Sequence, residues 1–121
     1  MKRVLVVDDD GPVRRIISHH LTKAGFAAVE AEDGMKALQV VRGTPVDVIL
    51  LDIRMPVMNG YELAEELQAD PTTAGIPIIV SSVVADEAQG RIVQARCFQL
   101  RPFRVRDLVA AVVAVVGPAS P

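Results

Sequence analysis

Short runs of aliphatic and β-branched residues alternate along the chain with segments of helical spacing, and this alternation limits the fold more than any other feature. The runs lie at residues 4–7, 28–31, 48–51, 78–81 and 97–100. Each has the length and composition of a β-strand. The runs are almost continuously apolar, which is typical of parallel strands covered on both faces of a sheet.

Five segments between or after these runs are expected to be helices. Pro12 stands at the first helical position of one that stops at Gly25, and Asp33 and Asn59 are expected to cap the second and third. The second is expected to end at Gly43 and the third before Pro71; a short fourth is expected around residues 86–95, and the fifth at 105–116. The residues expected to face inward in the first three are Val13, Ile16, Ile17, Leu21 and Ala24, then Ala37, Leu38 and Val41, then Leu63, Ala64 and Leu67.

Five strands alternating with five helices predict an α/β fold. In it, a five-stranded parallel sheet is doubly wound, with helices on both faces. The chain has 121 residues, half of them hydrophobic, which is enough for one domain with its own core. We expect that domain to occupy residues 1–116 and residues 117–121 to be a linker stub or disordered tail. Ligands in such sheets bind at the carboxyl ends of the strands.

Composition excludes several classes of protein. No run approaches the ~20 apolar residues of a membrane span, and the four apolar residues after Arg3 are too few for a signal peptide, so a cytoplasmic location is expected. Cys97 is the single cysteine, which leaves no internal disulfide or zinc site and favours a place in the core. Residues 91–121 carry five arginines against one acid, but with one Tyr and no Trp we expect a solvated face and no direct nucleic-acid binding.

Acidic residues follow two of the expected strands. Asp8, Asp9 and Asp10 come directly after the first, and Asp52 comes directly after the third. Carboxylates brought together at one sheet edge repel each other unless a cation neutralises them. All-oxygen ligation favours Mg²⁺ over Zn²⁺. The alternative is that Asp9 and Asp10 only cap the first helix and Asp52 only opens a loop.

Four stretches carry a resemblance to a known family. VLVVDDD (4–10), ILLDIRMPVMNG (49–60), PIIVSS (77–82) and RPF (101–103) occur in this order at the ends of the first, third, fourth and fifth expected strands. The chain thus resembles the receiver domains of bacterial response regulators over residues 2 to about 116. The resemblance implies a flavodoxin-like fold and a signalling domain that gains and loses a phosphoryl group without being a turnover enzyme.

The resemblance also implies roles for individual residues. Asp52 would accept a phosphoryl group from a histidine kinase or phosphotransfer protein and pass the signal to a downstream output domain or protein. Ser82 would bind a phosphoryl oxygen, and Phe98 would match the aromatic that swings inward on activation, although it is equally a plain core aromatic. The residues implied to hold Mg²⁺ are Asp8, Asp9, Asp52 and, through its backbone carbonyl, Arg54.

The chain departs from the family pattern at several positions. Arg101 stands where the family has lysine, and a planar guanidinium is not equivalent to a compact ammonium. Val83 replaces the usual Ala or Gly and is expected to narrow access to Asp52. Gln94 replaces the usual glycine before the last strand, and the stretch from Ser82 to Arg101 is shorter than usual, so the fourth helix or its loops must be trimmed.

Two alternative functions remain open. These departures favour a pseudo-receiver that acts as an interaction module without phosphorylation. The second alternative is a haloacid-dehalogenase-like phosphohydrolase, with Asp8 as nucleophile, Asp10 as acid/base, and Ser81 and Arg101 mimicking later motifs. It lacks a downstream acidic pair and leaves residues 52–60 unexplained.

The fifth expected helix is apolar on more than one side. Its core-spaced residues are Val105, Leu108, Val109, Val112 and Val116, and its other face carries Ala110, Ala111, Val113, Ala114 and Val115. A surface helix needs only one apolar stripe. We therefore expect the fourth helix, fifth strand and fifth helix to form a docking face, most simply for a homodimer. A partner domain or a neighbouring helix over the second stripe is the alternative.

Overall fold

The computed structural model describes residues 1–53, 55, 57–81, 92, 94–99 and 104–118, with only the backbone of residues 96–99. The strands are β1 (Arg3–Val7), β2 (Ala27–Ala31), β3 (Val48–Leu51), β4 (Ile78–Ser81) and β5 (Ala95–Gln99). The helices are α1 (Gly11–Lys23), α2 (Gly34–Gly43), α3 (Gly60–Ala69) and α5 (Val105–Val116). The expected fourth helix falls largely outside the described residues.

The strands form one parallel sheet in the order β2-β1-β3-β4-β5. Val7 is paired with Ala31 on one side and with Leu51 on the other, and Leu51 is paired with Val80. The carboxyl ends of the four strands β1 to β4 therefore lie at one level. Residues that directly follow these strands are brought to the same edge of the sheet.

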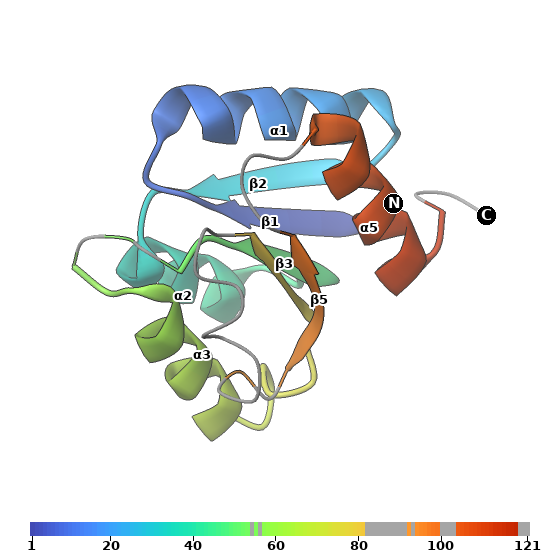
Figure 1. Cartoon of the computed structure of the whole chain (residues 1–121). Helices are drawn as coiled ribbons and strands as arrows, with labels where there is room; N and C mark the ends of the chain where they lie inside the picture. The colour runs from blue at the N-terminus through green and yellow to red at the C-terminus, as the bar shows by residue number, and fades with distance from the viewer. Residues whose placement is uncertain (54, 56, 82–91, 93, 100–103, 119–121) are drawn as a thin grey trace.

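Helices cover both faces of this sheet, as predicted (Figure 1). The helices α1 and α5 lie on one face, and α2 and α3 lie on the other. Each face has its own core: Leu21 and Phe26 belong to the α1/α5 side with Leu108, while Leu38 and Leu63 belong to the α2/α3 side. The doubly wound α/β architecture is confirmed.

Side-chain caps start the first three helices. The carboxylate of Asp10 accepts a hydrogen bond from the Val13 amide (3.2 Å), and that of Asp33 accepts one from the Lys36 amide (2.8 Å). Asn59 forms a capping box at the start of α3. These bonds satisfy amides that have no partner inside their own helix. The predicted caps at Asp33 and Asn59 are confirmed.

Four residues lie differently from the prediction, one of them Val115, which was expected on the outer face of α5 and packs partly against the core. Ile16, expected to face inward, is 50% exposed because it precedes the buried Ile17 and points about 100° away from it around the helix. Ala24 is exposed because α1 ends at Lys23. Ala111 was expected on the outer face of α5 but is 7% exposed, since it lies one turn from Leu108 on the inner face.

The fifth strand begins two residues earlier than predicted, at Ala95, which the sequence placed at the end of the fourth helix. A register shift between Ile78 and Ile79 accompanies its pairing with β4. The preceding residue, Gln94, is 4% exposed, and its side-chain amide donates to the carbonyls of Thr73 (2.9 Å) and Ile76 (2.7 Å). A buried side chain thus ties the start of β5 to the loop before β4.

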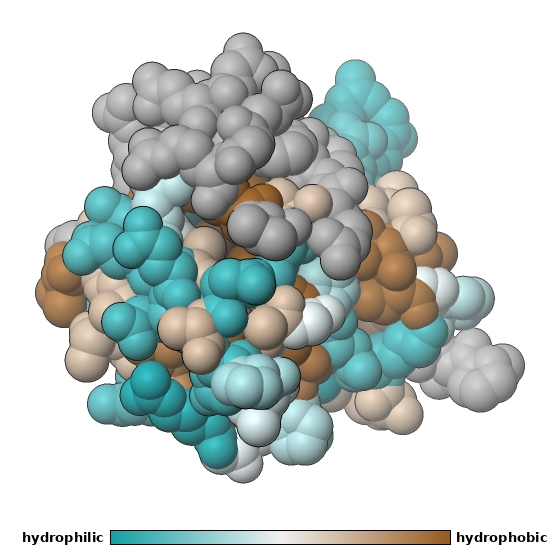
Figure 2. Space-filling view, turned by 90° about the horizontal axis from the view of Figure 1, so that it is seen from below, coloured by the Kyte–Doolittle hydropathy of each residue, from teal (hydrophilic) through white to brown (hydrophobic). Residues whose placement is uncertain are grey.

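Large exposed hydrophobic side chains are scattered over the described residues. On the face seen in Figure 2, hydrophobic and hydrophilic residues are interspersed. In α5 the exposed apolar residues are Ala110, Val113 (39%) and Ala114, while Val115 packs partly against the core. The outer apolar strip is therefore narrower than predicted, and the docking face stays a prediction.

Among the helices of the described part, none has the length and apolar character needed to cross a membrane.

Candidate functional site

The candidate site lies where β1 and β3 end side by side. Asp8 follows β1 and Asp52 follows β3, and both are buried, at 3% and 8% exposure. The Asp52 amide donates to the carbonyl of Val7 (3.0 Å), which fixes the end of β3 against the end of β1. Strand pairing, and not a flexible loop, sets the relative positions of these two residues.

Three carboxylates meet at this edge. Asp8, Asp9 and Asp52 each offer an oxygen that lies within 4.8 Å of the other two, with Asp9 exposed to solvent. We call these three residues the acid cluster. Asp10 has a different role, because its side chain caps α1. The predicted convergence of carboxylates is confirmed for three of the four residues.

The acid cluster fits a hard divalent cation. Its candidate ligands are all carboxylate oxygens, which suits Mg²⁺, and the group includes no histidine or cysteine of the kind that zinc favours. Asp9, the exposed member, is in contact with solvent, which suits an ion that gives up its water ligands reluctantly. The residues present therefore match the cation that the sequence predicts.

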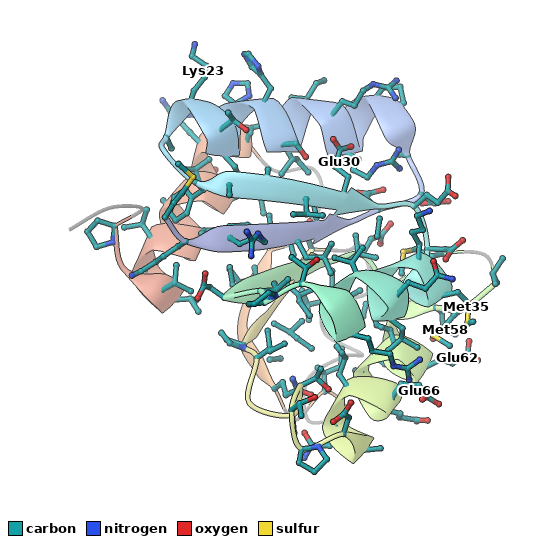
Figure 3. The ribbon with its side chains drawn as sticks, turned by 180° about the vertical axis from the view of Figure 1, so that it is seen from behind. Lys23, Glu30, Met35, Met58, Glu62 and Glu66 are labelled. Carbon is teal, nitrogen blue, oxygen red and sulfur yellow. The ribbon has the colours of Figure 1, made fainter. Side chains whose placement is uncertain are left out.

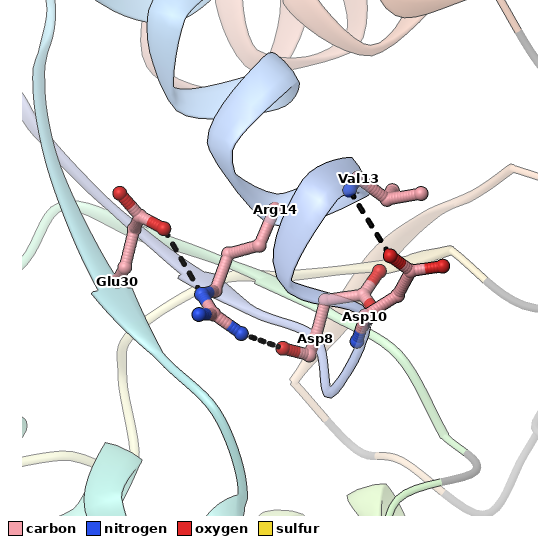
Figure 4. Close-up of polar contacts among 5 residues, drawn as sticks. All are labelled: Asp8, Asp10, Val13, Arg14 and Glu30. Atoms are coloured by element: carbon pink, nitrogen blue, oxygen red, sulfur yellow. Dashed lines mark hydrogen bonds and ion pairs between the residues drawn. The ribbon is translucent and has the colours of Figure 1, made fainter.

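Arg14 holds the backbone of Asp8, one member of the acid cluster, in place (Figure 4). Its Nη1 donates to the carbonyl of Asp8 (2.7 Å), and its Nε donates to the carboxylate of Glu30 on β2 (2.9 Å). The Asp10 amide in turn donates to Oδ1 of Asp8 (2.9 Å). The peptide and the side chain of Asp8 are thus both held. Neither Arg14 nor Glu30 was predicted from the sequence; the available signal was an arginine one turn into a helix that follows an acidic strand end.

The loop after Asp52 is closely packed at both ends. Gly60 donates to the carbonyl of Ile53 (2.8 Å), and a Cβ at position 60 would lie 2.8 Å from the Ile53 Cα, so only glycine fits. Gly34 makes a similar approach to Met58, which lies near Met35 in Figure 3. These two glycines allow the loop to sit directly against β3 and α2.

Val57 carries backbone strain within this loop. Its φ is +68°, in the left-handed region that β-branched residues rarely adopt, and its side chain is 78% exposed. Such strain persists only where the surrounding structure enforces it. Here Gly60 and the Asn59 capping box fix the loop on the far side of Val57.

Several predicted site residues lie outside the described part of the chain: Arg54, Ser82, Val83 and Arg101. The backbone of Phe98 lies in β5, paired with Val80, and its side chain is not described. The roles predicted for these five residues therefore rest on the sequence alone.

Comparison with known proteins identifies the family. The family model of the response regulator receiver domain matches residues 4–113. The chain belongs to this family. It is 38% identical to the phosphate regulon transcriptional regulatory protein PhoB of Pseudomonas aeruginosa, over 99% of this chain and 54% of that protein. It is 30% identical to the DNA-binding regulator RpaA of Synechocystis, over 96% of this chain and 49% of that protein.

Solved structures agree with this assignment of a receiver domain. The Vibrio cholerae chemotaxis protein CheY4 superimposes with a TM-score of 0.86 at 30% identity, covering 95% of this chain and 98% of that one. The Thermotoga maritima response regulator TrrA, solved in complex with Mg²⁺ and BeF, gives a TM-score of 0.83 at 28% identity, covering 95% and 99%. The chain spans about half the length of the curated relatives it matches.

Proposed function

We propose that Asp52 of this receiver domain accepts a phosphoryl group, with Mg²⁺ held by the acid cluster and by the predicted carbonyl of Arg54. The observation that carries this proposal is the meeting of three carboxylate oxygens within 4.8 Å at the carboxyl ends of β1 and β3. Holding three acids this close has an electrostatic cost that a purely structural module has no reason to bear.

The chemistry needs little more than position and charge screening. An oxygen of the ionised Asp52 carboxylate forms a bond to phosphorus while the bond from phosphorus to the donor breaks, and no proton has to leave Asp52. When bound, Mg²⁺ neutralises the charge of the incoming phosphoryl oxygens. Burial of Asp52 keeps bulk water away from most of its side chain. Ser82 supplies a hydroxyl donor and Arg101 a cation for the phosphoryl oxygens.

The remaining roles follow from the family. The donor is a histidine kinase or phosphotransfer protein in the cytoplasm, and an output domain or protein receives the signal. Phosphorylation replaces the single charge of the Asp52 carboxylate with an acyl phosphate that carries nearly two negative charges, and it shifts the population between two arrangements of the domain. The surface of the fourth helix, β5 and α5 is the proposed docking face, and residues 117–121 are the proposed linker.

Acetyl phosphate provides a direct test of the acceptor. In the presence of Mg²⁺, intact-protein mass spectrometry should show the addition of one phosphoryl group to the wild-type chain and none to Asp52→Asn. Asp9→Asn should slow the reaction by removing an exposed member of the acid cluster. Glu65→Gln, which changes an exposed acid on α3, is the matched control and should react like the wild type.

The outcome separates the proposal from its alternatives. A chain that stays unmodified at saturating acetyl phosphate and Mg²⁺ would be a pseudo-receiver. Steady hydrolysis of a phosphomonoester that survives Asp52→Asn and is lost in Asp10→Asn would indicate a phosphohydrolase. The position of the Asp10 side chain, which caps α1, argues against the second alternative.

A further inference from the structure

Ser81, the last residue of β4, has a buried hydroxyl that the proposed chemistry does not use. It is 5% exposed, and its Oγ has no hydrogen-bond partner in the described part of the chain. Because Leu51 is paired with Val80, Ser81 and Asp52 lie next to each other at the ends of neighbouring strands. The unpaired hydroxyl therefore lies beside the acid cluster.

A small pocket connects this hydroxyl with two of the carboxylates. Ser81, Asp8 and Asp52 line it together with strand residues and with one residue each from α1 and α5. Every lining residue is buried, Asp52 being the most exposed at 8%. The apolar walls on the α1/α5 side of the sheet are formed by Val6, Ile17, Leu50 and Leu108.

The chemistry of the pocket matches a single water molecule. Buried hydroxyl groups are almost always paired with a protein group or an ordered water. The pocket has room for about one water, and a buried water needs two to four polar partners. Ser81 supplies a donor, and the carboxylates of Asp8 and Asp52 supply acceptors.

We propose that this pocket binds one structural water. The water accepts a hydrogen bond from the Ser81 hydroxyl and donates one hydrogen bond to each of the carboxylates of Asp8 and Asp52. Each partner then has a complementary group, since carboxylates accept more than one hydrogen bond. Ser81 thereby becomes a positioning residue, which restrains the Asp52 side chain from within the sheet edge, while Asp9 is the member of the acid cluster that is exposed to solvent. The positioning role rests on the proposed function of Asp52; the water site does not.

Methyl NMR tests the water site without any phosphorylation. In wild-type protein labelled at Ile, Leu and Val methyls, long-lived water should give cross-relaxation peaks to Ile17, Leu50 and Leu108. Ile49 and Leu63, which are equally buried on the α2/α3 side, are the controls and should give none. Ser81→Val, which replaces the hydroxyl with a methyl and fills the pocket, should abolish the peaks. Wild-type protein without these peaks would overturn the water site.

Metal affinity tests the positioning role. Ser81 acts on Asp52 only through the water, so its loss should cost about as much as one ordinary hydrogen bond and weaken Mg²⁺ binding about threefold to tenfold in both Ser81→Ala and Ser81→Val. Ser81→Thr keeps the hydroxyl and should stay near the wild-type affinity. Chemical denaturation separates a loss of Mg²⁺ affinity from a loss of folding stability. Ser81→Val fills the pocket and should be at least as stable as Ser81→Ala, although both bind Mg²⁺ more weakly. Wild-type Mg²⁺ affinity in both hydroxyl-free variants would overturn the role. Failure of Asp52 to accept a phosphoryl group would leave the methyl result unchanged, so the two proposals fail separately.

Discussion

Helices α1 to α3 and helix α5 draw their stability from different sources. The first three each begin with a side chain that accepts hydrogen bonds from the first turn, at Asp10, Asp33 and Asn59. In contrast, α5 has Arg104 at its N-cap position, and no side chain caps this helix. Like the other three helices it buries core residues, here Leu108, Ala111 and Val112, but it has no capping side chain to add to this packing. Local signals thus mark the helices that follow β1 to β3, whereas α5 depends on packing, which is how most helices of marginal propensity are stabilised.

Removing the main core contact of α5 should have the largest effect. Leu108 is fully buried, and Leu108→Ala should lower the free energy of unfolding by about 2–5 kcal/mol through lost burial and the cavity left behind. Chemical denaturation measures this directly. Val113→Ala, at an exposed position of the same helix, should change stability by no more than about 0.5 kcal/mol. Similar losses in the two variants would contradict a packing-based account of α5.

The buried amide of Gln94 should come second. Gln94→Ala removes two hydrogen bonds to the carbonyls of Thr73 and Ile76 and leaves those acceptors without this donor, so unfolding should be easier by about 1–3 kcal/mol. Gln39→Ala, on the exposed side of α2, is the matched control and should be close to neutral. If Gln94→Ala were also neutral, β5 would not depend on this tie.

Capping variants test the other side of the comparison. Asn59→Ala should destabilise the domain by about 1 kcal/mol, because the Glu62 amide loses its side-chain acceptor. Arg104→Asp should act in the opposite sense and gain up to about 1 kcal/mol, since it supplies the missing side-chain cap and replaces a cation with an acid near Asp107, the acid already in the first turn of α5. An unchanged denaturation midpoint in Arg104→Asp would mean that the start of α5 is already satisfied.

Relief of strain at Val57 should give the smallest effect. Asn tolerates a positive φ far better than Val, so Val57→Asn should stabilise the domain by about 0.5–1 kcal/mol. Val57 is largely exposed, so little packing is lost. Val113→Asn, an exposed Val to Asn change in a regular helix, is the control and should not stabilise. A loss of stability in Val57→Asn would show that the loop holds no releasable strain.

The sequence predicted the parts of the fold that have local or periodic signals. Four strands and the caps at Asp33 and Asn59 follow from apolar runs and capping residues, and the convergence of Asp8 and Asp52 follows from parallel strand topology alone. The start of β5 was misplaced because the pairing of Ala95 with Ile78 and the burial of Gln94 depend on a loop distant in sequence. No periodic pattern reports such a contact.

The candidate site was only partly predictable for the same reason. Acidic residues at strand ends are visible in a sequence, whereas Arg14 reaches Asp8 and Glu30 only after α1 has packed on the sheet. In the sequence, nothing distinguishes Ser81 from other residues of its strand. Only the strand register places it beside Asp52, and only the packing of α1 and α5 makes its hydroxyl part of a pocket. Tertiary contacts, and not local propensity, create both features.

Backbone NMR during Mg²⁺ titration, with and without beryllofluoride as a phosphoryl mimic, shows whether the acid cluster binds Mg²⁺ and whether Asp52 is the phosphoryl site. Mg²⁺ alone should shift amides at the ends of β1 and β3, around Asp8, Asp9 and Asp52. Beryllofluoride should extend the changes only when Mg²⁺ is present, and Asp52→Asn should abolish that second response. If millimolar Mg²⁺ left these amides unchanged, the acid cluster would not be a metal site, and if beryllofluoride acted equally on Asp52→Asn, Asp52 would not be the phosphoryl acceptor.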